Sequence, residues 1–112
     1  MESSIRHENN VGVISLTGRL DSGAAPLFEE WFTGQDRPEC TRYLMDMSGM
    51  PYITSAGLRS ILKLAKLLET RGGILAFCAM NAPVQDLFRI SGFTSFLSIY
   101  DSREQALAAL AA

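Results

Sequence analysis

One segment near the middle of the chain constrains the fold most, because an apolar, strand-like run passes through a short polar turn directly into an amphipathic helix. The segment begins at Met45, turns around Thr54 and Ser55, and continues through Leu62. From Ala56 onward the apolar residues recur at helical spacing. Strands that alternate with helices build parallel sheets, since each parallel connection needs a crossover. The segment therefore predicts an α/β fold with a serine where a helix begins.

The rest of the chain continues this alternation. Strands are predicted at residues 4–7, 11–18, 41–47, 74–80 and 96–100, and helices at residues 24–32, 56–70, 83–90 and from 102 onward. Residues 74–80 are apolar apart from the Cys78 thiol, which predicts a central strand. The pattern predicts one α/β domain over residues 1–112, with a mostly parallel mixed β-sheet, an antiparallel N-terminal edge strand and about four helices.

Composition excludes several classes of protein. The chain is 47% apolar and 20% charged, as in ordinary globular proteins, and its formal net charge of −2 without a basic block argues against nucleic-acid and anionic-membrane partners. No apolar stretch approaches the roughly 20 residues of a spanning helix, and the polar N-terminus is unlike a signal peptide. We therefore expect a cytoplasmic protein. Cys40 and Cys78 lack the spacing of a zinc site and are expected to be buried thiols, so no metal is predicted.

The residues alone leave two roles open for Ser55. A hydroxyl at the start of a helix can cap free backbone N–H groups, or it can be an exposed site of modification. The turn follows a strand end, where open α/β sheets present their ligand surfaces. Asp21 or Ser22 is expected to cap the first helix, and Asp46 to hydrogen-bond the turn at Ser48 and Gly49.

Catalysis by Ser55 is not predicted. A serine nucleophile needs a base, and the single histidine, His7, lies on the distant N-terminal segment. The Gly-x-Ser-x-Gly elbow is missing, because Ile53 stands two residues before Ser55. Both nucleotide-binding glycine motifs are absent as well, so no catalytic residue and no cofactor are expected.

Four motifs carry a resemblance that spans nearly the whole chain. They are Gly18-Arg-Leu-Asp21, Met45-Asp-Met-Ser-Gly49, Tyr52-Ile-Thr-Ser-Ala-Gly-Leu58 and Leu87-Phe-Arg-Ile-Ser-Gly92. In these motifs and in its order of elements the chain resembles the STAS domain, and more narrowly the anti-sigma factor antagonists of bacterial partner-switching systems.

The resemblance implies a protein without catalytic activity that binds an anti-sigma factor, a serine kinase of the histidine-kinase-like ATPase fold. Binding of the unphosphorylated form releases the client of the kinase. Phosphorylation at the serine that matches Ser55 abolishes binding, and a metal-dependent serine phosphatase restores it. A monomer is expected. An alternative within the same fold is an adaptor subunit of a transporter or sensory scaffold that is not phosphorylated.

The sequence departs from the family pattern beside the serine. Thr54 replaces the usual aspartate and Ala56 replaces a frequent second serine, so Thr54 is a second candidate phosphoacceptor. Asp21 matches an aspartate of the family's partner surface. The residues expected to contact the partner are Asp21, Met50, Tyr52, Ile53, Thr54, Ser55, Ala56, Gly57 and Leu58.

Overall fold

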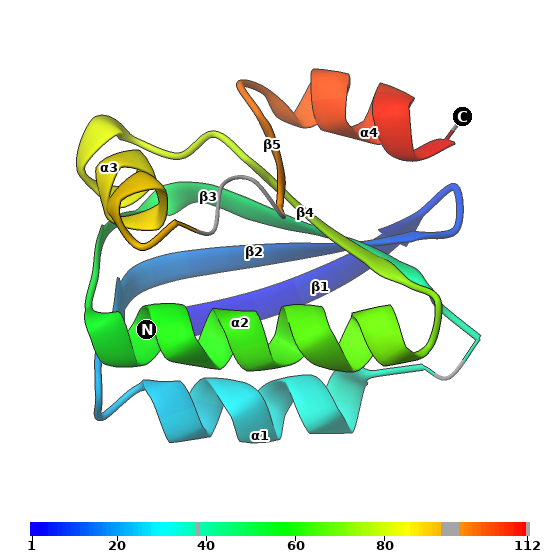
Figure 1. Ribbon diagram of the computed structural model, residues 1–112. Helices are drawn as coiled ribbons and strands as arrows, with labels where there is room; N and C mark the ends of the chain where they lie inside the picture. The colour runs from blue at the N-terminus through cyan, green and yellow to red at the C-terminus, as the bar shows by residue number, and fades with distance from the viewer. Residues whose placement is uncertain (38, 93–96, 112) are drawn as a thin grey trace.

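A single mixed sheet organises the computed structural model, which describes residues 1–37, 39–92 and 97–111. Its strands lie in the order β1-β2-β3-β4-β5 (Figure 1). β1 and β2 are antiparallel, and every later pair is parallel. The strands are β1 (Glu2–Glu8), β2 (Val11–Leu20), β3 (Arg42–Ile53), β4 (Ile74–Cys78) and β5 (Ser98–Tyr100). The predicted α/β class and antiparallel N-terminal edge are confirmed.

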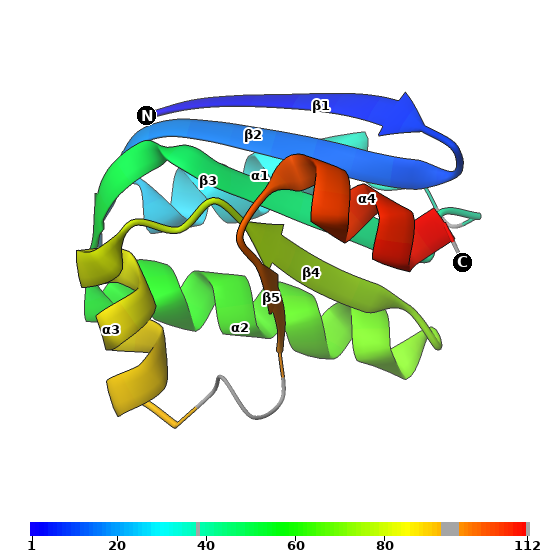
Figure 2. The same ribbon diagram turned by 90° about the horizontal axis from the view of Figure 1, so that it is seen from above.

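The helices cover both faces of this sheet unequally. They are α1 (Ala25–Gln35), α2 (Ser55–Thr70), α3 (Ala82–Ile90) and α4 (Arg103–Ala111). α1 and α2 lie side by side on one face and α4 lies on the other, while α3 stands at the end of the sheet where β3 meets α2 (Figures 1 and 2). No helix of the described residues is both long enough and apolar enough to cross a membrane.

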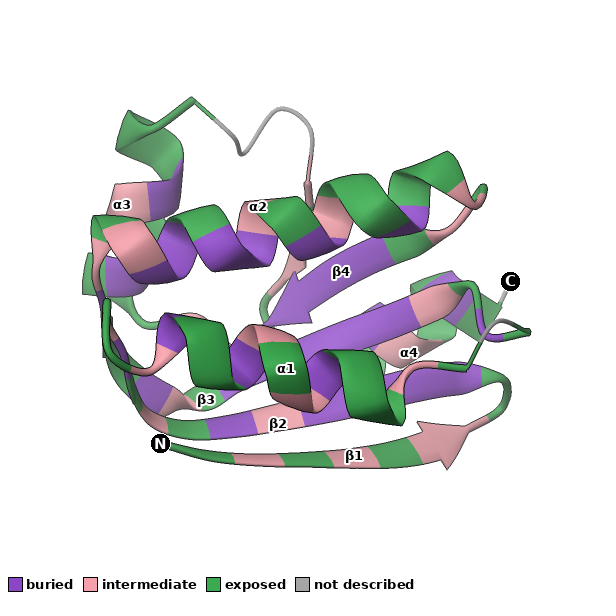
Figure 3. Ribbon diagram, turned by 90° about the horizontal axis from the view of Figure 1, so that it is seen from below, coloured by how far each residue is buried: buried purple, intermediate pink, exposed green. Residues whose placement is uncertain are grey.

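Two apolar clusters fill the spaces between these layers. The larger lies between the sheet and the α1–α2 layer, and its large, fully buried side chains include Phe28, Tyr43, Ile61 and Phe77. The smaller lies under α4 and contains Val11, Val13, Leu44, Ala76, Cys78, Ala106 and Leu110. β3 contributes to both clusters, and residues 43–47 are all buried (Figure 3). Burial on both faces explains why this strand is nearly continuously apolar.

The structure corrects the predicted strand positions. β3 is the central strand, whereas β4 lies one place from the edge. The apolar sequence of β4 is typical of a central strand because α2 and α4 bury both of its faces. Such burial does not require that the strand lie at the centre of the sheet. β2 extends two residues beyond the predicted end at Gly18. The predicted start of the last strand, Phe96, lies outside the described residues.

Asp46 has the structural role that the sequence predicts, and a second one. Its Oδ1 accepts a hydrogen bond from the Ser48 N–H at 2.9 Å. Its Oδ2 pairs with the Arg103 guanidinium at 2.7 Å, and Arg103 also donates to the Ser15 hydroxyl. Since Arg103 begins α4, this carboxylate fixes the start of α4 on the sheet. Ser102 caps the same helix end by accepting a hydrogen bond from the Gln105 N–H.

Candidate functional site

The junction of β3 and α2 is built around the hydroxyl of Thr54. β2 and β3 end together, with Leu20 opposite Ile53. The Thr54 N–H donates to the Leu20 carbonyl at 3.1 Å, and its Oγ1 donates to the same carbonyl at 3.3 Å. Oγ1 also accepts from the Gly57 N–H at 3.2 Å, so Thr54 is the N-cap of α2. Its hydroxyl is engaged as both donor and acceptor.

Ser55 has a different environment although it is the next residue. It is the first residue of α2 and is exposed. Its hydroxyl makes no hydrogen bond to any residue that the structure describes. The two roles that the sequence left open for this turn are therefore divided: Thr54 caps the helix, and Ser55 is accessible.

Gly57 allows α2 to approach β2 closely enough for this junction to form. A Cβ at this position would lie 2.1 Å from the Leu20 carbonyl oxygen, which no packing adjustment of a side chain can relieve. The absence of a side chain at Gly57 thus brings the start of α2 against the end of β2.

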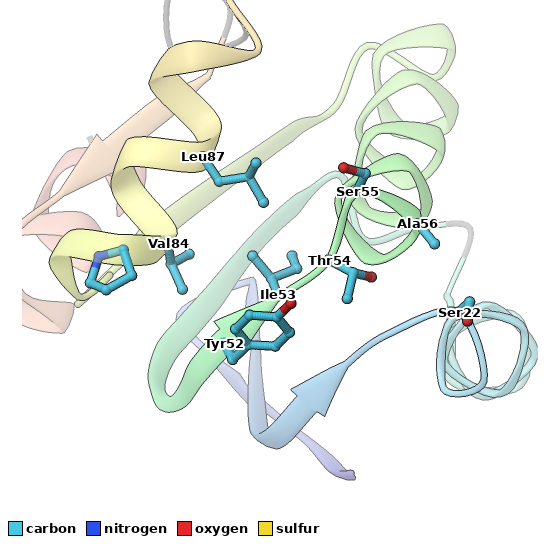
Figure 4. A pocket seen from close by; sticks show the side chains of 9 residues that line it. Ser22, Tyr52, Ile53, Thr54, Ser55, Ala56, Val84 and Leu87 are labelled. Atoms are coloured by element: carbon cyan, nitrogen blue, oxygen red, sulfur yellow. The ribbon is translucent and has the colours of Figure 1, made fainter.

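Ser55 opens onto a groove of about 600 Å³ between α2, the end of β3 and α3. Figure 4 shows Val84 and Leu87 projecting from α3 toward Ile53 and Ser55. The start of α3 is tied to β3 by a hydrogen bond of 3.1 Å from the Asn81 amide to the Pro51 carbonyl. The groove is lined by Ser22, Tyr52, Ile53, Thr54, Ser55, Ala56, Pro83, Val84 and Leu87. Apart from three hydroxyl-bearing residues and the tyrosine, these side chains are apolar.

Asp21 lies beside this groove but does not occupy the cap position predicted for it. The N-cap of α1 is Ala24, which makes no side-chain cap bond. The Asp21 carboxylate instead accepts from the Ala24 and Gly23 N–H groups at 2.9 and 3.1 Å, and so closes the turn before the helix. The Ala24 hydrogen bond, with smaller contributions from Gly23 and the charge of Arg19, lowers the pKa of Asp21. The turn therefore carries a negative charge at neutral pH.

The partner surface expected from the sequence divides into exposed and buried positions. Tyr52, Thr54, Ser55, Ala56 and Asp21 are exposed or half-buried. Met50 is fully buried, and Gly57 and Leu58 are also buried, because the packing of α2 on the sheet covers them. We therefore leave Met50, Gly57 and Leu58 out of the contact surface. Ile53 is buried but lines the groove.

Sequence reasoning missed the other wall of the groove. In the sequence, Val84 and Leu87 have the spacing of core residues on a helix. They lie near Ser55 only because of where α3 packs in the folded protein. Arg19 was also missed: its guanidinium lies 4.6 Å from the centre of the Tyr52 ring, because Arg19 and Tyr52 are opposite one another on β2 and β3.

The site lacks the parts of a serine nucleophile within the described residues. His7 pairs with Gly12 near the start of β2, whereas Ser55 lies beside Leu20 at the end of that strand. The described residues contain no group of three His, Cys, Asp or Glu side chains that could hold a metal ion. What the site offers is an accessible hydroxyl on a helix N-terminus beside an apolar groove.

Comparisons with known proteins agree with this arrangement. The profile of the STAS domain family matches residues 2–106. BtrV of Bordetella bronchiseptica, assigned as an anti-sigma factor antagonist, is 36% identical over 87% of this chain and 84% of its own length. The anti-sigma F factor antagonist of Paenibacillus polymyxa is 28% identical over 98% of this chain and 95% of its own length.

Solved structures share the fold at lower sequence identity. A Thermotoga maritima protein assigned as an anti-sigma factor antagonist has a TM-score of 0.90 at 19% identity, covering 96% of this chain and 92% of its own. The Bacillus cell fate determinant SpoIIAA in its phosphorylated form has a TM-score of 0.74 at 18% identity, covering 97% of this chain and 99% of its own. By the profile match and the shared identity with curated relatives, the chain belongs to the STAS domain family and, within it, to the anti-sigma factor antagonists of partner-switching systems.

Proposed function

We propose that this antagonist is controlled by phosphorylation at Ser55. The unphosphorylated form binds an anti-sigma factor that is a serine kinase of the histidine-kinase-like ATPase fold, and this binding releases the client of the kinase. Phosphorylation of Ser55 abolishes binding, and a metal-dependent serine phosphatase restores it. The protein acts in the cytoplasm without catalytic activity of its own. The observation that carries the proposal is the exposed Ser55 hydroxyl, which has no hydrogen bond to the described residues, next to a fully engaged Thr54.

The position of Ser55 lets the fold accept a phosphoryl group. Phosphorylation adds a charge of about −1.5 to −2 and three acceptor oxygens. Backbone N–H groups of the first turn of α2 lack helical partners, and the helix dipole favours an anion there. Because Thr54 supplies the cap, modification of Ser55 breaks none of the hydrogen bonds that hold the junction.

The same modification opposes binding of a partner at the groove. Ile53, Ala56, Val84 and Leu87 give the groove an apolar lining, so a protein seated there excludes water from Ser55. A dianion in that contact loses its hydration, which costs several kcal/mol when no cation compensates it. A cost of about 4 kcal/mol corresponds to roughly three decades in affinity.

Two relatives support this proposal. One is named an antagonist of anti-sigma factor F, and the structure of SpoIIAA, which shares the fold, is known in a phosphorylated form. The name of the first protein and the phosphorylated form of the second support an anti-sigma factor as the partner and phosphorylation as the modification that controls binding.

The experiment incubates the protein with ATP and each histidine-kinase-like anti-sigma factor of its source cell, and locates phosphate by peptide mass spectrometry. We expect phosphate on Ser55, its loss in Ser55→Ala, and its retention in Thr54→Val. Phosphate on Thr54 would support control by phosphorylation but would move the phosphoacceptor from Ser55 to Thr54. No phosphate with any of these kinases would contradict the proposal and favour an adaptor that is not phosphorylated.

A further inference from the structure

The edge strand β1 presents a long, regular and unpaired side. Within the described part of the chain, β1 pairs with β2 alone (Figure 2). Its seven residues contain no proline, and its register with β2 runs from Glu2 opposite Thr17 to Glu8 opposite Val11 without a shift. Proline and bulges are common devices that prevent an edge strand from pairing with another chain. β1 lacks both.

The side chains of β1 alternate between two different faces. Ser3, Ile5 and His7 are half-buried, and Ile5 packs against the core on the α1 side. Glu2, Ser4 and Arg6 are exposed and, because side chains alternate along a strand, lie on the opposite face. This face therefore carries Glu2, a neutral position, Arg6 and then the half-buried Glu8, whose carboxylate lies 3.9 Å from the Arg6 guanidinium.

This order makes β1 complementary to a second copy of itself. In a two-fold antiparallel pairing, residues that face one another lie on the same side of the sheet. A pairing centred on Ser4 places Glu2 opposite Arg6 of the second copy, and Arg6 opposite its Glu2. The pairing centred on Ile5 would place Glu2 opposite Glu8, and the pairing centred on Arg6 would oppose two arginines. Opposite charges across strands stabilise a pair and like charges destabilise it, so of these three registers the one about Ser4 is favoured.

An apolar groove adjoins the same edge. It lies between β1 and α1 and is lined by Met1, Ser3, Ala24, Leu27, Phe28 and Trp31. Leu27 is 67% exposed although its neighbour Phe28 is fully buried. A second copy that continues the sheet at β1 would bring its own α1 alongside and cover this surface.

We propose that β1 is a self-association surface, at which two copies pair antiparallel about Ser4 into one continuous sheet. The inference goes beyond the proposed function, because the Ser55 groove lies between α2 and α3, away from the β1 edge (Figure 2). The Ser55 groove stays open in the pair. The proposed dimer differs from the monomer expected from the sequence, which did not consider pairing of β1 with a second copy.

Charge exchange tests the proposal directly. The mass in solution is measured by light scattering over a range of concentrations, with twice the 12.3 kDa of the chain expected at high concentration. Glu2→Arg and Arg6→Glu each convert both cross-strand pairs to like charges, so each should weaken self-association about tenfold or more. The double variant restores opposite charges and should restore association. Glu69→Arg and Lys66→Glu on α2 are the matched controls and should associate like the unaltered protein.

A cross-link at the symmetry axis checks the register without altering charge. In Ser4→Cys the introduced thiols of the two copies face one another and should form an intermolecular disulfide under mild oxidation. Cys40 and Cys78 are buried and should remain free. A cysteine at Glu2 faces Arg6 of the second copy and should not cross-link. A monomer at every concentration, a dimer indifferent to the single charge reversals, or equal cross-linking at both positions would each overturn the proposal.

Discussion

At the scale of single residues, two neighbouring hydroxyls have separate tasks. Thr54 donates to the Leu20 carbonyl and accepts from the Gly57 N–H, so its oxygen belongs to the fold. Ser55 is exposed and free of such bonds among the described residues. A phosphoryl group on Thr54 would replace the hydroxyl hydrogen that Thr54 donates to the Leu20 carbonyl. A phosphoryl group on Ser55 leaves the cap intact. This difference is the structural reason for proposing Ser55, and not Thr54, as the phosphoacceptor.

This division predicts different stabilities for two alanine variants. Thr54→Ala removes the cap of α2 and should lower the free energy of unfolding by about 1 kcal/mol. Ser55→Ala removes an exposed hydroxyl and should change it by less than about 0.5 kcal/mol. Denaturant unfolding measures both. Thr54→Ser keeps the capping oxygen and serves as control; equal losses in the two alanine variants would mean that Ser55 shares the cap.

At the scale of elements, the site depends on how closely α2 meets the end of β2. Gly57 permits this approach, since its position faces the Leu20 carbonyl oxygen. The C-terminal ends of α1 and α2 are joined by a bidentate ion pair. The two terminal nitrogens of the Arg71 guanidinium donate to the Asp36 carboxylate oxygens at 2.9 and 3.1 Å. The two helices are thus fixed near both ends, which keeps the N-terminus of α2 in place.

Substitution at Gly57 should separate α2 from β2. In Gly57→Ala the new Cβ overlaps backbone, and we expect a loss of about 1–3 kcal/mol in the free energy of unfolding. Gly34 is the matched control, because it lies within α1 and a Cβ added there would meet no atom of another residue within 4 Å. Gly34→Ala should leave stability unchanged or raise it by up to about 1 kcal/mol. Equal effects of the two substitutions would show that the close approach at Gly57 is not required.

The attachment of α4 predicts a dependence on pH. Burial raises the pKa of Asp46, but hydrogen bonds from the Ser48 N–H and hydroxyl and the Arg103 guanidinium outweigh burial and hold that pKa below its usual value. The unfolded carboxyl titrates near 3.9, so the stabilisation is complete above about pH 4 and is lost as the pH falls further.

Asp46→Asn should therefore lower the free energy of unfolding at pH 7 by about 1.5–3 kcal/mol, because Arg103 loses its charged partner. The difference from the unaltered protein should shrink as the pH falls below about 4. Urea unfolding at a series of pH values measures this difference, with the exposed Asp101→Asn as control. A constant difference across the acid range would argue against a role for the Asp46 charge.

At the scale of the whole molecule, the sheet places every part of the proposed switch at one end. β2 and β3 are parallel neighbours, so Leu20, Thr54 and the turn at Asp21 meet where both strands finish. α3 completes the groove from the other side. Ser55 is exposed at this end, so a change of charge on its side chain is made at the surface of the molecule.

Much of this arrangement could be predicted from the sequence. The β-rich composition of residues 11–18 predicted the strand, the helical period of residues 56–70 predicted the helix, and the turn motif located Ser55. The walls of the groove could not be predicted, because the contact of Val84 and Leu87 with the Ser55 region depends on how α3 folds back along β3. The burial of Met50 was missed for a similar reason: its strand continues beyond the predicted end at Met47 and remains covered.

Phosphate on Ser55 is proposed to abolish partner binding without altering the fold. The most direct measurement titrates the cognate anti-sigma factor with the unmodified protein and with the protein phosphorylated at Ser55, and compares the two dissociation constants by calorimetry. We predict that Kd rises by about three decades while the free energy of unfolding changes by less than about 1 kcal/mol. Equal dissociation constants for the two forms would contradict the account.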